Sequence, residues 1–332
     1  MNILVINFKK YILTFLLILF TISLLLYSET NIVAAQNGFI LWATKVLPSL
    51  FPFFVATELL CRSNFTYILG NFLNKFMKPI FNVSGEGSLA LILGTTSGYP
   101  IGAKVICTLK KEKKISKIEA ERLIAYSNNS NPLFILSTVG ISIFNNKKLG
   151  YILLASHILS SLAVGFCFKY WKKNKYDLSY KEEKFNMQNS PIKIHEFGEL
   201  LGNSIKQSIS SLLSICGFIV LFSILLSMLQ NNGFINLLTS IFLKFGIPES
   251  ISSATITGII ELTNGVYLAA SFFNNFPIIC ILITSFLLGF GGISILLQIY
   301  SIIAKENISI KPYFYGKLLH GILSMFFTYL LI

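Results

Sequence analysis

Long uncharged apolar runs alternate with short polar, mostly basic segments along the whole chain. No charged residue occurs in residues 11–28, 123–146, 149–168, 207–243 and 262–304. A helix needs about 20 apolar residues to span a bilayer, so each run holds at least one span or nearly one. The pattern predicts an all-α polytopic membrane protein.

One apolar segment, residues 88–107, is predicted to be broken in its middle. Its centre is Gly94–Lys104, with the sequence GTTSGYPIGAK. Gly98 can adopt a positive φ, and Pro100 suits the first turn of a new helix. We therefore expect one helix to end near Ser97 and the next to begin near Pro100. Broken backbone at membrane depth faces protein or a wet cavity, and in transporters such breaks hold substrate. A packing kink at a helix contact is the alternative.

A second break is predicted after a short helix. Ser116 and Glu119 form the capping-box pattern Ser-x-x-Glu, which opens that helix. The helix ends at the polar cluster 127–132, SNNSNP, where Asn131 suits an N-cap and Pro132 a first turn. A fresh helix N-terminus offers unpaired N–H groups and the positive end of the helix dipole. The cluster is therefore a second candidate site, with a solvent-exposed loop as the alternative.

The second half of the chain echoes the first at a nearly constant spacing. Gly94, for example, corresponds to Gly258, an offset of 258 − 94 = 164. The segments that correspond to the two breaks are 258–265, GIIELTNG, and 289–294, GFGGIS. Both again place glycine and polar residues inside long apolar runs. Paired interruptions of this kind point to the binding site of a transporter.

This repeat divides the chain into four parts. They are an N-terminal span with its connection, a first repeat, a cytoplasmic linker and a second repeat, at residues 1–37, 38–171, 172–202 and 203–332. Lys and Arg concentrate in alternate polar segments, which the positive-inside rule places in the cytoplasm. On that map, segments 88–107 and 252–274 re-enter from opposite sides. The repeat is therefore expected to be inverted, with transport by rocking of one half against the other.

The first part of the chain carries further membrane signals. The apolar run 11–27 exceeds the usual length of a signal-peptide core, which favours a retained span over a cleaved leader. Residues 38–61 should form a long helix interrupted at Pro48 and Pro52. Residues 66–81 should form an amphipathic helix on the membrane surface.

Charge and reactive residues exclude several classes of protein. The net charge of +13 arises in short polar loops, so nucleic acid is not an expected partner. Five scattered cysteines without a CxxC pair, and three isolated histidines, indicate neither a disulfide framework nor a metal site. His157 lies in an apolar run and is interpreted as a core histidine. HExxH, GxSxG and paired catalytic carboxylates are absent, so we expect neither an enzyme nor a cofactor.

Five segments of the sequence resemble a known family. They are 47–54 (LPSLFPFF), 97–104 (SGYPIGAK), 119–123 (EAERL), 128–135 (NNSNPLFI) and 261–265 (ELTNG). These segments resemble the YlbJ (SpoVV) family of sporulation integral membrane proteins. That family belongs to the nucleoside-recognition (Gate domain) superfamily and is similar in its core to concentrative nucleoside carriers. The resemblance runs from about residue 38 to the C-terminus, and Asn131 stands where the family commonly has glycine.

The resemblance implies transport of dipicolinate (pyridine-2,6-dicarboxylate) across the outer forespore membrane of an endospore-forming bacterium. Lys104 and the helix starts at Tyr99–Pro100 and Asn131–Pro132 would then supply positive potential to a planar dianion. Glu261 would pair with Lys104 or carry a coupled proton. The candidate substrate-binding residues are Ser97, Gly98, Tyr99, Lys104, Asn128, Asn129, Ser130, Asn131, Glu261, Thr263, Asn264, Gly291, Gly292 and Ser294.

Two other functions stay open at this point. A carrier of nucleosides or of another small polar solute would use Glu261 and the asparagines to bind ribose and base, leaving Lys104 as an interface anchor. A non-transporting structural protein of spore assembly would not need polar breaks in its spans. The expected partners are a small-molecule substrate and the lipid bilayer, and the sequence leaves a coupling ion and a homo-oligomer open.

Overall fold

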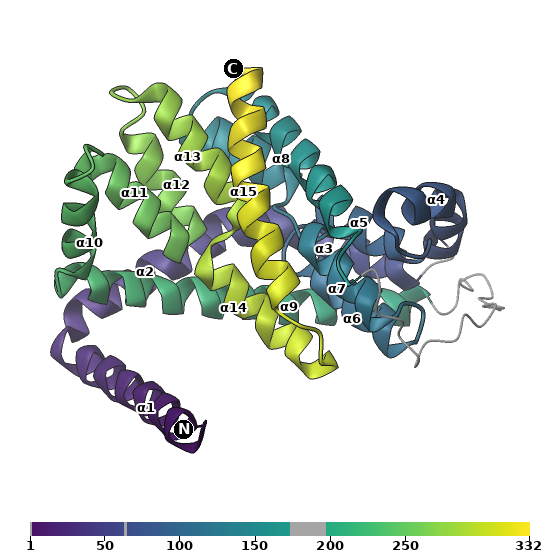
Figure 1. The fold of residues 1–332 in the computed structure, drawn as a ribbon, viewed down its shortest axis with the longest axis horizontal. Coiled ribbons are helices and arrows are strands. Elements are labelled where there is room, and N and C mark those ends of the chain that lie inside the picture. The colour runs from purple at the N-terminus through teal and green to yellow at the C-terminus, as the bar shows by residue number, and fades with distance from the viewer. Residues whose placement is uncertain (1, 63–64, 173–196) are drawn as a thin grey trace.

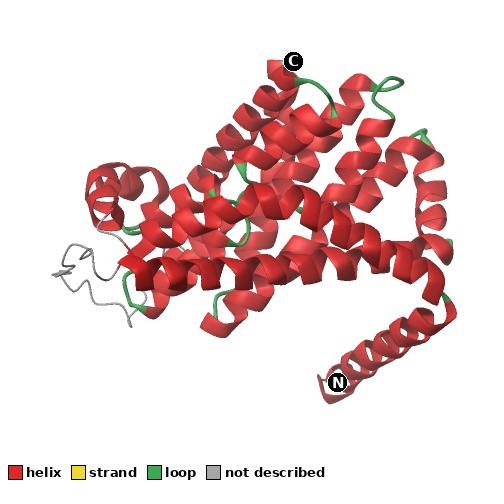
Figure 2. Cartoon of the chain, turned by 180° about the vertical axis from the view of Figure 1, so that it is seen from behind, coloured by secondary structure: helices red, strands yellow, loops and turns green. Residues whose placement is uncertain are grey.

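The computed structural model describes residues 2–62, 65–172 and 197–332, and these contain helices and loops but no β-strand (Figures 1 and 2). The elements of the first half are α1 Asn2–Leu26, α2 Ser28–Leu41, η1 Trp42–Val46, α3 Leu47–Arg62, α4 Phe65–Phe81, α5 Gly87–Thr96, α6 Ile101–Lys111, α7 Lys117–Tyr126, η2 Phe134–Ile143 and α8 Lys147–Phe168. Those of the second half are α9 Phe197–Asn231, α10 Phe234–Leu243, α11 Glu249–Ile260, α12 Leu262–Ser271, α13 Pro277–Phe290, α14 Gly292–Ile303, η4 Ala304–Glu306 and α15 Lys311–Leu331. Most of the expected linker lies outside the described residues.

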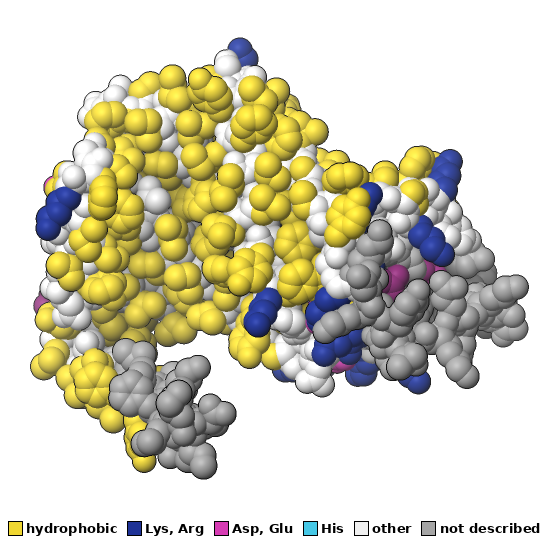
Figure 3. Space-filling view, in the orientation of Figure 1, with side chains coloured by type: hydrophobic (Ala, Val, Ile, Leu, Met, Phe, Trp, Pro, Cys, Tyr) yellow, Lys and Arg dark blue, Asp and Glu magenta, His cyan; other side chains and the backbone are white. Residues whose placement is uncertain are grey.

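Several helices have the length and composition of membrane spans. Within the described residues these are α8, α9, the segment Pro277–Glu306 and α15, and the bent pair α1–α2 also qualifies, with an angle of 99° between its helices. Apolar side chains cover most of the face shown in Figure 3, whereas Lys and Arg gather near α6 and α7. A surface this apolar is stable in lipid rather than in water. The chain is therefore an all-α integral membrane protein.

The elements follow the same order in the two halves. In each half a helix, α4 or α10, precedes a hairpin of two short helices, α5–α6 or α11–α12. Each half then ends on a long helix, α8 or α15, and these two helices pack against each other. α4 and α10 lie at opposite ends of the molecule (Figure 1). This common order agrees with an internal repeat, while the bounds of the repeats and their inverted symmetry stay predictions.

The two early prolines do not interrupt their helix as expected. Residues 28–62 are helical throughout, and Pro52 lies inside α3. The π-helical turn η1 precedes Pro48, and the N–H of Leu47 donates to the carbonyl of Trp42, five residues earlier. A π turn already shifts the backbone hydrogen bonds by one residue, so it accommodates the missing donor of a proline without ending the helix.

The capping box at the start of α7 is confirmed. Ser116 Oγ accepts the Glu119 N–H at 3.2 Å, and Glu119 Oε2 accepts the Ser116 N–H at 2.8 Å. Glu119 Oε1 also accepts the Ser84 N–H at 2.7 Å, so this carboxylate joins α7 to the loop before α5.

The next two charged residues of α7, Glu121 and Arg122, also hold the fold together. Arg122 donates to the carbonyls of Asn82, at 2.7 Å, and Trp171, at 3.0 Å. Glu121 Oε2 accepts from Trp171 Nε1 at 2.9 Å and from Lys172 Nζ at 2.6 Å. The EAERL segment therefore fastens α7 to the end of α8 and to the end of α4.

Ser116→Ala is expected to lower the unfolding free energy by about 1 kcal/mol, because the N-cap acceptor is lost. Ser116→Asp keeps an acceptor at this position and should stay close to the wild type. Thermal unfolding of the purified protein in detergent measures the difference. Equal midpoints for Ser116→Ala and the wild type would contradict this role of the capping box.

Candidate functional site

Both breaks of the first half occur where the sequence predicts them. Break 1, residues 97–100, separates α5 from α6, and Gly98 there has φ of 79°. Break 2, residues 127–131, lies between α7 and η2, and Asn131 Oδ1 accepts the Leu133 N–H at 2.7 Å. Asn131 is not among the described residues with positive φ. Break 2 therefore does not require a glycine at this position, and the asparagine acts as a cap.

The breaks of the second half also occur close to their expected positions. Break 3 is Glu261, whose extended backbone (φ −140°, ψ 118°) separates α11 from α12, three residues before the expected centre at Asn264. Break 4 is Gly291, with φ of 86°, followed by Gly292 with φ of 82°. Four new helices, α6, η2, α12 and α14, thus begin after the four breaks.

Asparagine amides join break 2 to the α5–α6 hairpin. Asn131 Nδ2 donates to the carbonyls of Thr96 and Ser97, at 3.1 and 3.2 Å. Asn128 Oδ1 accepts the Ala103 N–H, at 3.2 Å, in the first turn of α6. Helix ends leave such backbone groups without an intrahelical partner. The run of asparagines in the sequence therefore satisfies the backbone of a neighbouring break.

Gly94 and Gly102 allow the hairpin to approach break 2 at backbone distance. A Cβ added at Gly94 would lie 1.7 Å from the carbonyl oxygen of Ser127, and one at Gly102 would lie 2.5 Å from the same atom. The carbonyl of Gly94 also accepts the Asn129 N–H at 3.2 Å. Both glycines are needed because another segment of backbone occupies the space of a side chain.

Residues of all four breaks, or of the turns that follow them, line one cavity of about 90 Å³. Polar residues and glycine on its wall are Ser97, Gly98, Tyr99, Ser130, Asn131, Glu261, Thr263, Ser294 and Gln298. Apolar side chains of η1, α3 and α9 also line it, among them Val46, Leu50 and Phe218. Ligand pockets usually have volumes of roughly 300–1,000 Å³. The cavity is therefore smaller than a usual ligand pocket.

Eight of the fourteen predicted site residues line this cavity. The other six are Lys104, Asn128, Asn129, Asn264, Gly291 and Gly292. Lys104 Nζ donates to Ser211 Oγ on α9 and interacts electrostatically with Glu58 on α3. Its ammonium group therefore binds other helices and does not contribute to the cavity wall.

Glu261 caps a helix and does not pair with Lys104, one of the two roles that the sequence suggested for it. Its Oε1 accepts the Thr263 N–H at 3.0 Å, and its Oε2 accepts the Asn264 N–H at 2.8 Å. The carboxylate thus compensates the positive end of α12 at the cavity wall. In the described part of the chain no three His, Cys, Asp or Glu side chains are grouped as metal ligands.

Hydrogen bonds join the two halves of the chain beside the cavity. Tyr99 Oη donates to the carbonyl of Leu288 at 3.2 Å. Ser130 Oγ lies 3.3 Å from both of these oxygen atoms. A Cβ at Gly291 would lie 3.1 Å from Tyr99 Oη, so break 4 also touches this tyrosine. These contacts must separate if one half moves against the other.

A buried basic residue that the sequence analysis did not identify lies next to these breaks. Lys317 of α15 is 1% exposed. Its Nζ donates to Asn129 Oδ1 at 3.3 Å and lies 3.2 Å from His320 Nδ1. It also lies 5.3 Å from the centroid of the Tyr99 ring. Lys317 therefore contacts Asn129 of break 2 and the ring of Tyr99 in break 1. Tyr99 also lines the cavity.

Two histidines that stand apart in the sequence lie together beside this lysine. The ring of His157, on α8, is 4.5 Å from that of His320, on α15. The sequence of α15 contains a helical period that could have identified this cluster. Its buried polar residues recur every three or four positions: Tyr313, Lys317, His320, Ser324 and Thr328. In a membrane helix such a polar face points toward protein.

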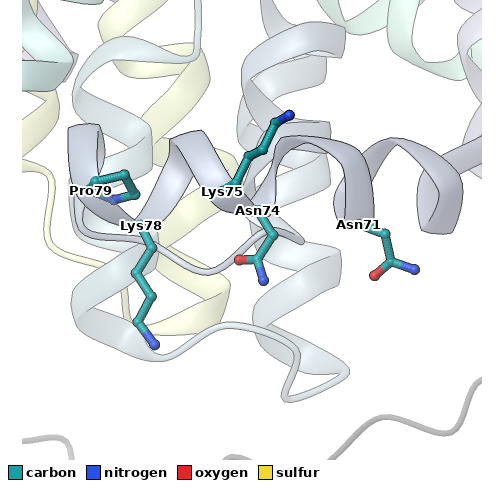
Figure 4. Close-up of a pocket in the computed structure, with 5 residues that line it drawn as sticks. All are labelled: Asn71, Asn74, Lys75, Lys78 and Pro79. Atoms are coloured by element: carbon teal, nitrogen blue, oxygen red, sulfur yellow. The ribbon is translucent and has the colours of Figure 1, made fainter.

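A second hollow, of about 560 Å³, lies along α4 and contains no residue of the breaks. It is lined by Asn71, Asn74, Lys75, Lys78 and Pro79. Figure 4 shows Asn71, Asn74 and Lys78 on one side of the helix, with Lys75 pointing away from them. Ile68, Phe72 and Phe76 of the same helix are exposed apolar side chains. The residues that line this hollow therefore form the polar face of an amphipathic helix, as expected for residues 66–81.

Comparisons with known proteins identify relatives of the chain. A family model described as nucleoside recognition (Gate) matches residues 43–147, which include breaks 1 and 2. The chain is 34% identical over 327 residues to the sporulation integral membrane protein YlbJ of Bacillus subtilis (strain 168). That match covers 94% of this chain and 80% of the relative. No solved structure is significantly similar to this one.

Proposed function

Because the chain belongs to the family of the sporulation integral membrane protein YlbJ, we propose that it transports a small organic anion, dipicolinate, across the outer forespore membrane. The meeting of four helix breaks at one cavity is the observation that carries the proposal. Each unpaired backbone group costs several kcal/mol in hydrocarbon. Four breaks at one place are therefore expected in a carrier, where they bind a polar solute, and not in a purely structural membrane protein.

The four helix starts at the cavity differ in their capacity to bind an anion. Side chains of Asn128 and Glu261 already accept N–H groups in the first turns of α6 and α12, and Asn131 accepts the N–H of Leu133, the residue before η2. α14 begins without a side-chain cap, and Ser294 in its first turn lines the cavity. Free N–H groups and the positive end of the dipole favour a carboxylate. One carboxylate of the substrate would therefore bind at the start of α14.

Transport requires that the cavity open to each side of the membrane in turn. The Tyr99–Leu288 hydrogen bond joins residues 189 positions apart, one in each repeat. Rocking of one repeat against the other would break this hydrogen bond and open the cavity to one side of the membrane. The four breaks would stay near the middle of the membrane. The substrate would then replace the lost hydrogen bonds at the exposed wall.

A carrier of nucleosides is the second candidate, and the position of Glu261 favours it. Among the described residues Glu261 is the one charged side chain on the cavity wall. A carboxylate accepts hydrogen bonds from ribose hydroxyls, whereas it repels a dianion. The description of the matching family model agrees with this alternative.

Uptake by the purified protein in liposomes tests the proposal. Labelled dipicolinate should accumulate in protein-containing liposomes above the level of empty ones, and excess uridine or adenosine should not reduce it. Saturable nucleoside uptake without dipicolinate uptake would favour the second candidate. Uptake of neither solute would contradict both.

Glu261→Gln is expected to separate the two candidates further. For a dianion, removal of the negative charge should offset the loss of one capping bond worth about 1 kcal/mol, so dipicolinate uptake should stay within about threefold of the wild type. Glu249→Gln, at the exposed start of α11, is the matched control. A loss of dipicolinate uptake of tenfold or more in Glu261→Gln alone would argue against the anion site.

A further inference from the structure

The histidines beside Lys317 have fixed donor and acceptor roles. His320 Nε2 lies 3.0 Å from the carbonyl oxygen of His157, which can only accept, so His320 Nε2 carries a proton. His320 Nδ1 is then the acceptor that faces Lys317 Nζ. His157 Nε2 accepts the N–H of Ser130 at 3.2 Å. The lone pairs of His320 Nδ1 and His157 Nε2 therefore each accept a hydrogen bond. A nitrogen that accepts carries no proton, so both imidazoles are neutral.

Lys317 is the group in this cluster that can gain or lose a proton while keeping its partners. An ammonium group has three donors, which suit Asn129 Oδ1, His320 Nδ1 and the face of the Tyr99 ring. A neutral amine keeps two donors for the two hydrogen-bond acceptors. Protonation of either histidine, in contrast, would set one N–H against another.

The elements around α15 bring no negative charge to Lys317. The titratable groups that face it are His320 and Tyr313 on α15, His157 on α8 and Tyr99 in break 1. On α7, the charged pair Glu121 and Arg122 binds Trp171, Lys172 and the Asn82 carbonyl instead. α13 carries one titratable residue, Cys280.

Lys317 therefore lacks a counter-charge in the described structure. The ion pairs Lys114–Glu112 and Lys172–Glu121 do not involve Lys317. A buried ammonium without a compensating anion is costly. An anion in the cavity would lie on the other side of Tyr99, whose ring is 5.3 Å from Lys317 Nζ and which lines the cavity.

We propose that Lys317 takes up a proton when an anionic substrate enters the cavity and releases it when the substrate leaves. The inference rests on the proposed transport function and names its coupling ion. In this step the neutral amine binds a proton from the aqueous solution and becomes an ammonium group, whose charge compensates one carboxylate of the substrate. The protein would then be a proton–anion symporter.

Dipicolinate binding to the purified full-length protein tests the coupling. The affinity should be measured between about pH 6 and pH 9, where carboxylates stay ionised. Proton uptake should be followed with an indicator dye in weakly buffered solution. We expect up to about one proton per dipicolinate bound, and an affinity that falls by up to about tenfold per pH unit as Lys317 loses its proton.

Variants assign the proton to Lys317. Lys317→Gln should bind dipicolinate at least tenfold more weakly at pH 6, with no proton uptake and no pH dependence. Lys317→Arg keeps the charge at every pH, so its binding should not depend on pH. His320→Gln should keep the pH dependence of the wild type. Lys311→Gln, at the exposed start of the same helix, is the matched control and should behave as the wild type.

The outcomes separate this inference from the proposed function. Dipicolinate binding without proton uptake by the wild type, or proton uptake retained in Lys317→Gln or lost in His320→Gln, would overturn the inference. Absence of dipicolinate binding at every pH would overturn the proposed function and the inference with it. The wild-type proton measurement keeps the test decisive even if Lys317→Gln does not fold.

Discussion

A single methyl group added at Gly94 is expected to prevent folding or to cost more than about 3 kcal/mol of stability. The new Cβ would lie 1.7 Å from the carbonyl oxygen of Ser127 and 3.0 Å from the Cα of Gly102. Both neighbours are backbone atoms, so no change of rotamer relieves the overlap. α5 would have to move away from break 2 and lose the bond from the Asn129 N–H to the Gly94 carbonyl, which is 3.2 Å long.

Gly217→Ala is the matched control for this variant. It makes the same chemical change inside α9, where an added Cβ meets nothing within 4 Å. Alanine favours a helix over glycine by about 1 kcal/mol, so stability should be unchanged or slightly raised. The monodisperse fraction and the thermal midpoint in detergent measure both variants. Wild-type behaviour of Gly94→Ala would mean that α5 does not touch break 2 in the folded protein.

The helix breaks could be predicted from the sequence because their causes are local. Glycines such as Gly98 and Gly291 permit positive φ, and Asn131 provides a cap from within its own segment. The same holds for the capping box of Ser116 and Glu119. Each signal depends on a few neighbouring residues, so no knowledge of tertiary packing was needed.

The direction of side chains could not be predicted in the same way. Lys104 and Lys317 both lie within helices, but Lys104 faces Ser211 on α9 while Lys317 faces Asn129 at the centre. Which of them lies near the cavity depends on the rotation of α6 and α15 about their axes. Contacts between helices far apart in the sequence fix that rotation, and local sequence does not report them.

The prolines before the first break show the same limit of local signals. A proline predicts an interruption because its N–H is missing and its ring is bulky. The π turn at Trp42–Val46 lies just before Pro48, and the helix continues through Pro52 to Arg62. Trp42, Val46 and Leu50 are buried members of the core cluster. Burial of this helix face favours a continuous helix, and local sequence does not report that burial.

Asn131→Asp, although isosteric, is expected to abolish dipicolinate uptake and to lower stability. Asn131 is 4% exposed, and its Nδ2 donates to the carbonyls of Thr96 and Ser97. An aspartate would place a carboxylate oxygen against these two carbonyls and lose both bonds. Each lost bond is worth about 0.5–1.5 kcal/mol, and a buried unpaired charge costs several kcal/mol more. Breaks 1 and 2 should therefore separate.

Comparison with two other variants isolates the charge as the cause. Asn131→Ala loses the same bonds, and also the cap on the Leu133 N–H, but it introduces no charge and should retain more activity than Asn131→Asp. Asn307→Asp makes the same chemical change at an exposed residue with φ of 53°, a conformation that aspartate tolerates, and should behave as the wild type. Uptake per folded protein and the thermal midpoint measure all three. If Asn131→Asp transported better than Asn131→Ala, the amide of Asn131 would not be the link between breaks 1 and 2.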